Sequence, residues 1–177
     1  MVPRSVIESC LPRTRQIEEY QRHSGGFVMK VRDVMTADPH CCSVSDNAQT
    51  AAKIMARDEV GAVPVIVGGN HRKLIGIVTD RDLCISVIAG GADPCSTTLQ
   101  QCMSTNPVSC REGDDIQTVS DLMKEHQVRR IPVVDSQSKV VGIVATADLA
   151  REEEVDRTET GEVLAQISQD TTHRVSS

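Results

Sequence analysis

The chain has almost no aromatic side chains: among its 177 residues there is no tryptophan, one tyrosine and one phenylalanine. Both aromatic residues, Tyr20 and Phe27, lie close to the amino terminus, so the core further along the chain must be aliphatic. Stacking of nucleic-acid bases needs aromatic rings and is nearly excluded. Positive charge is scarce too, because 19 basic residues stand against 25 acidic ones, for a net charge of −6. Non-specific nucleic-acid binding needs a basic surface, so we expect no nucleic-acid partner.

Signals for a membrane span, for secretion and for disulfides are also lacking. No apolar run approaches the roughly 18 residues that a transmembrane helix needs. The basic amino-terminal segment is not followed by the apolar stretch of a signal peptide. The seven cysteines are an odd number, and no two of them are spaced Cys-x-x-Cys. These absences predict a cytoplasmic protein with reduced thiols and no membrane association.

What the sequence does have is an internal repeat of three motifs. Residues 34–39 (VMTADP) correspond to 102–107 (CMSTNP), residues 61–65 (GAVPV) to 129–133 (RRIPV), and residues 76–83 (GIVTDRDL) to 142–149 (GIVATADL). The first two offsets are 68 residues and the third is 66, as expected if one loop of the second copy is two residues shorter. Repetition at a fixed spacing indicates two copies of one structural unit that pack on each other.

Both copies have the pattern of a β-α-β-β-α unit, which places the chain in the α/β (α+β) class. In the first copy we expect strands at 41–44, 62–67 and 74–78, a helix over 48–56 capped by Ser45 or Asp46, a turn at 68–70 and a second helix from Thr79. In the second copy we expect a short strand that contains residues 109–110, a helix capped by Asp114 or Asp115, strands at 131–134 and 140–144, and a closing helix at 147–153. Helices cover only one face of each sheet in this arrangement, so the other face must meet its own copy or another chain.

The repeats divide the chain into four parts. Residues 1–30 are predicted to form a leader that is partly helical or disordered, 31–92 the first repeat, 93–151 the second repeat, and 152–177 an acidic, polar tail. Each repeat alone would bury too little surface to be more than marginally stable. We therefore expect the two repeats to pack as one cooperative unit.

The three motifs resemble those of the CBS domain, a family named after cystathionine β-synthase. Met35 and Pro39 open the pattern, Pro64 lies in its central strand, Thr79 and Asp82 end it, and the order recurs in the second copy. The tandem resembles a Bateman module, and residues 79–82 (TDRD) and 126–132 (HQVRRIP) resemble those of small stand-alone bacterial CBS-pair proteins. The resemblance implies two repeats about a pseudo-two-fold axis with two clefts, a flat homodimer, and binding of AMP, ADP, ATP or a related adenosine compound.

In that family the hydroxyl at the position of Thr79 reaches a ribose or phosphate oxygen, and the carboxylate at the position of Asp82 accepts the ribose hydroxyls. The chemistry fits, because a carboxylate accepts two donors at once and a helix amino terminus offers free N–H groups to phosphate. The same Thr-x-x-Asp spacing also suits a capping box that only closes its own helix. In the second copy Ala145 lacks the hydroxyl, Thr146 stands one place too late and Asp148 is kept, so we predict unequal clefts.

Phosphate binding needs positive charge, which the resemblance assigns to Arg129 and Arg130, with Arg81 as a further candidate. Planar guanidinium groups pair well with phosphate oxygens. The alternative is that these arginines form ion pairs with acidic residues on the surface or across a dimer. In relatives the backbone at this place reads the adenine edge, which here would be the backbone of Ala62, Val63, Arg130 and Ile131.

A second constellation suggests zinc, because imidazole and thiolate ligands suit that metal. His40 and Cys42 could share an ion, whereas Cys41 points to the opposite face of the strand. A further ligand such as His71, Cys84 or Cys110 would have to come from elsewhere in the fold. A buried cysteine is more often a small apolar core residue. The matching positions of Cys42 and Cys110 favour that role for both.

No catalytic motif is recognisable: there is no Gly-x-Ser-x-Gly, no phosphate-binding P-loop and no His-Glu-x-x-His helix. We therefore predict a non-enzymatic regulatory module that binds an adenine nucleotide in the cleft between the repeats and acts on an unidentified protein effector. The alternative is a ligand-free dimeric scaffold stabilised by zinc. An aliphatic two-helix face on each repeat predicts an isologous homodimer in either case.

Overall fold

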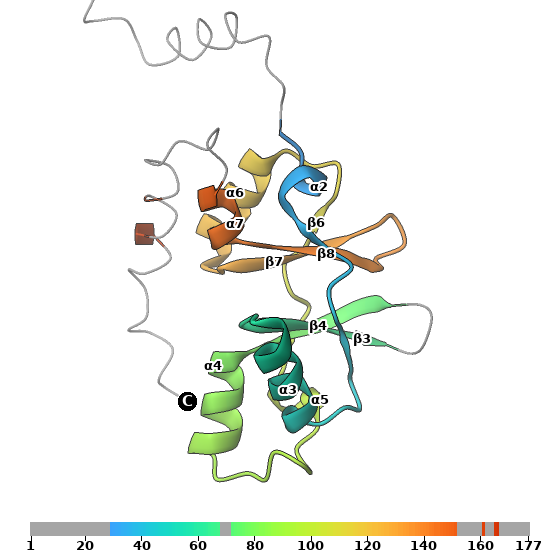
Figure 1. Ribbon diagram of the computed structural model, residues 1–177, viewed down its shortest axis with the longest axis vertical. Helices are drawn as coiled ribbons and strands as arrows, with labels where there is room; N and C mark the ends of the chain where they lie inside the picture. The colour runs from blue at the N-terminus through green and yellow to red at the C-terminus, as the bar shows by residue number, and fades with distance from the viewer. Residues whose placement is uncertain (1–28, 68–71, 152–160, 162–164, 167–177) are drawn as a thin grey trace, which may run out of the picture.

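The computed structural model describes residues 29–67, 72–151, 161, 165 and 166 (Figure 1). Both repeats are covered apart from residues 68–71. Most of the predicted leader, the predicted turn at 68–70 and nearly all of the predicted tail lie outside the described residues.

Each repeat forms the predicted β-α-β-β-α unit, preceded by a short helix and strand that the sequence did not predict. The first part of the chain contains α2 (Val31–Val34), β1 (Thr36–Ala37), β2 (Cys42–Ser43), α3 (Ala48–Asp58), β3 (Ala62–Val67), β4 (Lys73–Thr79), α4 (Asp80–Leu83) and the π-helix η3 (Cys84–Ala89). The second part contains α5 (Leu99–Cys102), β5 (Ser104–Thr105), β6 (Cys110–Arg111), α6 (Ile116–His126), β7 (Arg130–Val134), β8 (Val140–Ala145) and α7 (Thr146–Arg151). The mixed α+β class is confirmed.

The strands form two four-stranded sheets, and the two halves of the chain exchange their first segments. One sheet has the order β2-β3-β4-β5 and the other β1-β8-β7-β6. Strand β1 therefore pairs with β8 of the second half, and β5 pairs with β4 of the first half. Two backbone bonds fix the crossing helices, because the N–H of Val31 donates to the carbonyl of Asp114 (3.0 Å) and that of Leu99 to the carbonyl of Asp46 (2.8 Å).

Backbone geometry repeats in the two halves, as a pseudo-two-fold axis requires. Outside glycine, the described residues with positive φ form three matched pairs: Asp38 and Asn106, Glu59 and Gln127, and Arg72 and Ser138. The hairpin ends also bond reciprocally. The N–H of Leu74 donates to the carbonyl of Ser138, and the N–H of Val140 donates to the carbonyl of Arg72, each at 3.0 Å.

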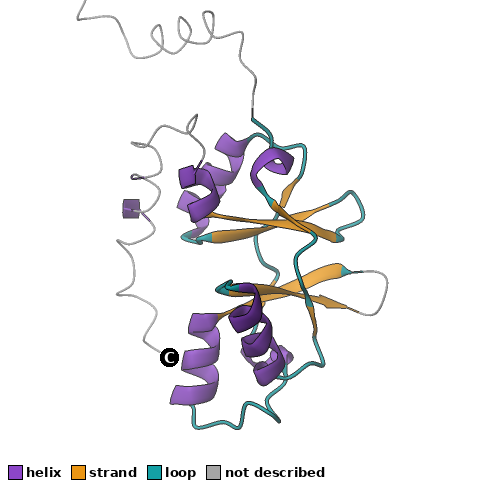
Figure 2. Ribbon diagram, in the orientation of Figure 1, coloured by secondary structure: helices purple, strands orange, loops and turns teal. Residues whose placement is uncertain are grey.

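Each sheet packs its helices on one face and turns the other face toward the opposite sheet (Figure 2). The two hydrophobic clusters lie on the helix-covered faces and contain aliphatic and sulfur side chains only, as predicted. Strand alternation explains the division, because Val63 and Val65 enter the first cluster while Pro64 between them does not. Pro64 pairs with Ile77, and Pro132 pairs with Ile143. These pairs line the space between the sheets.

The capping residue predicted for α3 is wrong by one position. Asn47 is the N-cap, and its Oδ1 accepts a hydrogen bond from the N–H of Thr50 at 2.9 Å. Asp46 instead accepts from the N–H of Ser43 (2.7 Å) and so closes the turn after β2. In the second half Asp115 is the N-cap, as one of the two predicted candidates.

Candidate functional site

The start of α4 is the most polar point of the sequence motif, and its two side chains form a capping box. The N–H of Thr79 donates to Asp82 Oδ2 (2.9 Å), and the N–H of Asp82 donates to Thr79 Oγ1 (3.1 Å). The Thr79 hydroxyl donates to the same carboxylate oxygen at 2.8 Å. The structural role that the Thr-x-x-Asp spacing predicts is therefore present.

Helix capping leaves part of the Asp82 carboxylate available. Within the described residues, the hydrogen bonds that this side chain accepts end on Oδ2. A carboxylate has about four lone-pair sites on its two oxygens, so Oδ1 can accept hydroxyl donors from a ligand while Oδ2 holds the helix. Asp82 is half-buried, which keeps the carboxylate fixed yet reachable.

Arg130 from the second half lies against the first half at this same end. A Cβ on Gly61 would lie 2.5 Å from Arg130 Nη2 and 2.9 Å from Asp80 Oδ2. The guanidinium can approach the start of β3 this closely because residue 61 has no side chain. The carbonyl of Gly61 accepts a hydrogen bond from the N–H of Asp80 (3.2 Å). Arg130 therefore stands beside the first turn of α4, next to the capping box.

The matching point of the second half lacks the hydroxyl, as the sequence indicated. The N–H of Ala145 donates to Asp148 Oδ2 at 2.8 Å, which is half of the capping box. Thr146 is 6% exposed, and its hydroxyl donates to the carbonyl of Arg129 at 3.1 Å. Thr146 thus bonds to the start of β7 and cannot replace the lost hydroxyl.

The remaining predicted site residues on the strands point either toward the opposite sheet or into the hydrophobic clusters. Ala62 pairs with Thr79 on the face turned toward the opposite sheet. Val63 and Ile131 are fully buried in the two clusters, so their side chains are not available to a ligand in the cleft. Strand β2 pairs in parallel with β3 only from Val65 onward, so the backbone of Ala62 and Val63 lies before the first residue of β2. The two remaining arginines, Arg81 and Arg129, are exposed.

An open hollow lies at the other end of the two sheets, where the hairpins bond to each other. It has a volume of about 220 Å³ and is lined by Leu74, Asn106, Pro107, Ser109, Val134 and Ser138. The sequence analysis assigned no ligand role to these residues. The one indication that it offered is that residues 106 and 107 end the first motif of the second copy.

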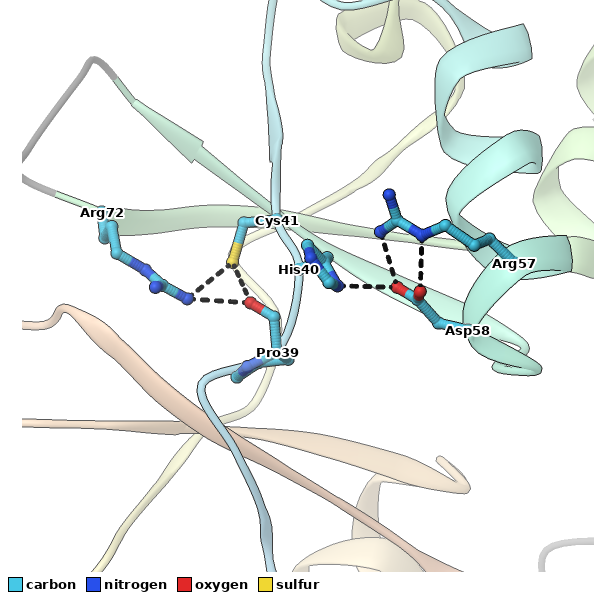
Figure 3. Close-up of polar contacts among 6 residues, drawn as sticks. All are labelled: Pro39, His40, Cys41, Arg57, Asp58 and Arg72. Atoms are coloured by element: carbon cyan, nitrogen blue, oxygen red, sulfur yellow. Dashed lines mark hydrogen bonds and ion pairs between the residues drawn. The ribbon is translucent and has the colours of Figure 1, made fainter.

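Arg72 is a further residue that the sequence did not single out. Its Nη2 donates to the carbonyl of Pro39 (2.8 Å) and to Cys41 Sγ (3.4 Å), as Figure 3 shows, and its Nη1 pairs with Asp38. The Nε atom is buried without a hydrogen-bond partner in the described part of the chain. The guanidinium is thus held against residues 38–41 of the first repeat.

The residues proposed for zinc do not assemble a site. The His40 side chain is 65% exposed, and its Nδ1 lies 2.8 Å from Asp58 Oδ2 (Figure 3), whereas Cys42 is fully buried in the first cluster. No group of three or more His, Cys, Asp or Glu residues in the described ranges could hold a metal ion. Cys42 and Cys110 occupy matching core positions, in line with the apolar role that their spacing favours.

Burial makes a measurable prediction for these thiols. Desolvation raises the pKa of both Cys42 and Cys110 to about 12, with Asp46 and Asp114 respectively adding to the shift. The reactive species is the thiolate, and a raised pKa leaves both groups protonated throughout pH 7–8. Iodoacetamide at pH 7.5 should therefore label the exposed Cys84 and leave both core thiols unmodified. Peptide mass spectrometry checks this, and rapid labelling of Cys42 would contradict the placement.

Comparison with known proteins identifies the family. A model described as "CBS domain" matches twice, at residues 31–88 and 99–154. The chain therefore belongs to the CBS-domain family, and its tandem pair is a Bateman module. It is 41% identical over 140 residues to uncharacterized protein YlbB of Bacillus subtilis (strain 168), an alignment that covers 79% of this chain and 92% of the relative.

Solved structures share the same fold. The chain is similar to Hypoxic Response Protein I, crystallised with two coordinated zinc ions, with a TM-score of 0.63, 35% identity, and coverage of 70% of this chain and 98% of that one. It is also similar to the CBS domain pair of protein MJ0100 in complex with 5′-methylthioadenosine and S-adenosyl-L-methionine. The TM-score is again 0.63, with 27% identity and coverage of 70% and 94%. None of the described helices is long and apolar enough to span a membrane.

Proposed function

We propose that this CBS pair is a non-enzymatic sensor that binds an adenine nucleotide between its two halves. Asp82 Oδ1 would accept the ribose hydroxyls, and Arg130, with Arg81 and Arg129 nearby in the motifs, would supply positive charge for the phosphates. The observation that carries the proposal is the contact of Arg130 with Gly61 beside Asp80. It brings a cation from one repeat to the helix start of the other.

The ligand chemistry gains support from the MJ0100 domain pair, which holds two adenosine compounds and is 27% identical to this chain. The zinc scaffold gains less support, because His40 and Cys42 lie in different surroundings and no third ligand joins them among the described residues. We therefore retain the nucleotide sensor over the zinc scaffold.

The proposed sensor forms an isologous homodimer through the helical face of its first repeat. The two most exposed large apolar side chains among the described residues are Ile88 (75%) and Ile85 (54%), both on η3. A two-fold axis brings the same apolar patch of a second copy onto this face. Occupancy of the cleft can alter the dimer only as far as the ligand prefers one arrangement of the two copies.

Nucleotide binding is tested by thermal shift and isothermal titration with AMP, ADP, ATP and S-adenosylmethionine. A ligand that binds the folded state raises stability by RT ln(1 + [L]/Kd), so at least one compound should raise Tm at millimolar concentration. Replacing Asp82 by asparagine removes a charged acceptor. Because hydrogen bonds to charged groups contribute about 1.5–3 kcal/mol, affinity should fall by roughly 10- to 100-fold.

Asp148→Asn is the matched control, because Asp148 caps its helix through the same backbone geometry. It should cost similar stability and change affinity much less, since its half of the motif lacks the hydroxyl at Ala145. An unchanged Tm with all four compounds contradicts nucleotide binding. Equal losses of affinity in both variants would contradict the predicted inequality of the clefts.

A further inference from the structure

The Arg130 guanidinium and the Asp80 carboxylate approach the same point, just before strand β3 of the first repeat. That point is where a Cβ on Gly61 would lie, 2.5 Å from Arg130 Nη2 and 2.9 Å from Asp80 Oδ2. The two atoms can therefore be no further apart than these distances added together, well within the Debye length of about 8 Å at physiological ionic strength. No ion pair of the described residues joins them. Asp80 thus weakens the positive field of Arg130 without binding the guanidinium.

Stabilisation of its own helix accounts for only one oxygen of the Asp80 carboxylate. Oδ1 accepts a hydrogen bond from the N–H of Arg81 at 2.8 Å in the first turn of α4, where a negative charge suits the positive end of the helix dipole. Oδ2, the oxygen beside Gly61, accepts no hydrogen bond from the described residues. The fold does not require an acid at this place, because the matching residue of the second repeat is Thr146, which begins α7. Asp80 Oδ2 is therefore free to act on a ligand beside Arg130.

Arg130 is the least solvent-screened cation among the three arginines of the proposed phosphate site. It is half-buried, and its side chain makes no hydrogen bond or ion pair within the described part of the chain. Arg81 and Arg129 are exposed, so water and salt screen their charges. One guanidinium pairs well with one phosphate group. The site can therefore neutralise a single phosphate, and further phosphates would stand in the field of Asp80 without a second shielded cation.

We infer that Asp80 is a specificity-determining residue, which restricts the site to an adenosine monophosphate and disfavours di- and triphosphates. This inference rests on the proposed function and names the class of nucleotide. The repulsion between Asp80 and the ligand grows with each added phosphate, because every added negative charge contributes its own Coulomb energy. The attraction to Arg130 grows less, since the first phosphate already occupies the guanidinium. The balance of the two effects favours the nucleotide with the fewest phosphates.

The test is isothermal titration of the full chain with AMP, ADP and ATP, at low ionic strength and without divalent metal ions. The wild-type chain should bind AMP most tightly and ATP least tightly. Asp80→Asn keeps an oxygen acceptor for the N–H of Arg81 and removes the negative charge, so the affinity for ATP relative to AMP should rise about fivefold or more. Salt at about 1 M, where the Debye length is about 3 Å, should remove most of that rise.

Glu112→Gln is the matched control, because it removes the same charge from an exposed residue far from the site. Glu112 follows β6, whose Arg111 pairs with Val134 at the opposite end of β7 from Arg130. This variant should leave the ratio of ATP to AMP affinity unchanged. Asp80→Ala should give the same rise as Asp80→Asn, which separates the loss of charge from any new contact of the amide. Circular dichroism melting checks that every variant is folded.

The outcomes distinguish this inference from the proposed function. Tighter binding of ATP than of AMP by the wild type, or an unchanged affinity ratio in the folded Asp80 variants, overturns the role of Asp80 and leaves nucleotide binding in place. Loss of AMP binding in folded Asp80→Asn also overturns it, because Asp80 would then hold the ligand rather than select it. Absence of nucleotide binding to every form overturns the proposed function, and this inference falls with it.

Discussion

Replacing Leu99 by alanine should lower the free energy of unfolding by about 3 kcal/mol, since buried Leu→Ala changes cost roughly 2–5 kcal/mol. Leu99 is fully buried and is among the largest fully buried side chains of the described chain. It follows the first repeat in sequence but packs in the cluster of that first repeat. Its backbone N–H also donates to the carbonyl of Asp46, which holds α5 in place and limits how far it can relax into the cavity.

Urea denaturation followed by circular dichroism measures this loss, with the free energy extrapolated linearly to zero denaturant. Val67→Ala is the control, because Val67 is 46% exposed at the end of β3 and a surface substitution should change stability by about 0.5 kcal/mol or less. A single transition should persist in the Leu99 variant. A loss below about 1 kcal/mol would show that α5 does not belong to the first core.

Replacing Ile88 by aspartate should convert the proposed dimer to a monomer at micromolar concentration. A carboxylate at the centre of an apolar contact is desolvated without a partner, which costs several kcal/mol. The dissociation constant should therefore rise on the order of 100-fold or more. Sedimentation equilibrium over a concentration series measures it directly.

Val67→Asp is the matched control for association, because it places the same charge on an exposed valine of β3 outside the η3 patch. It should dimerise like the wild type. Ile85→Asp, three residues before Ile88 on the same exposed π-helix, should weaken the dimer as well. A wild-type monomer, or an Ile88 variant that remains dimeric, contradicts an interface on η3.

The sequence was sufficient for the repeat, the strands of the two hairpins and the start of α4 because these depend on local patterns. Continuous β-branched runs predict β3 and β7, and Thr79 with Asp82 predicts the helix start. The crossing segments were missed for a physical reason. Strands β1 and β5 have two residues each, too few for a periodicity of two to be visible.

The candidate site was only partly predictable. The sequence marked Arg130 as a candidate cation for phosphate. Its contact with Gly61 depends on how the halves face each other, which no local pattern contains. The contacts of Arg72 were missed for the same reason, since Pro39 and Cys41 lie more than 30 residues before it in the sequence.

The exchange of α2 and β1 for α5 and β5 means that neither repeat completes its own sheet. In a polypeptide with one repeat, the first strand would have no partner strand, and one edge of the sheet would remain unpaired. Two such polypeptides would satisfy each other by swapping these arms, with the same hydrogen bonds that now form within one molecule. Gene duplication and fusion could thus have begun from a swapped dimer of half-length ancestors. After fusion the two repeats are covalently linked, so their association no longer depends on the concentration of the protein.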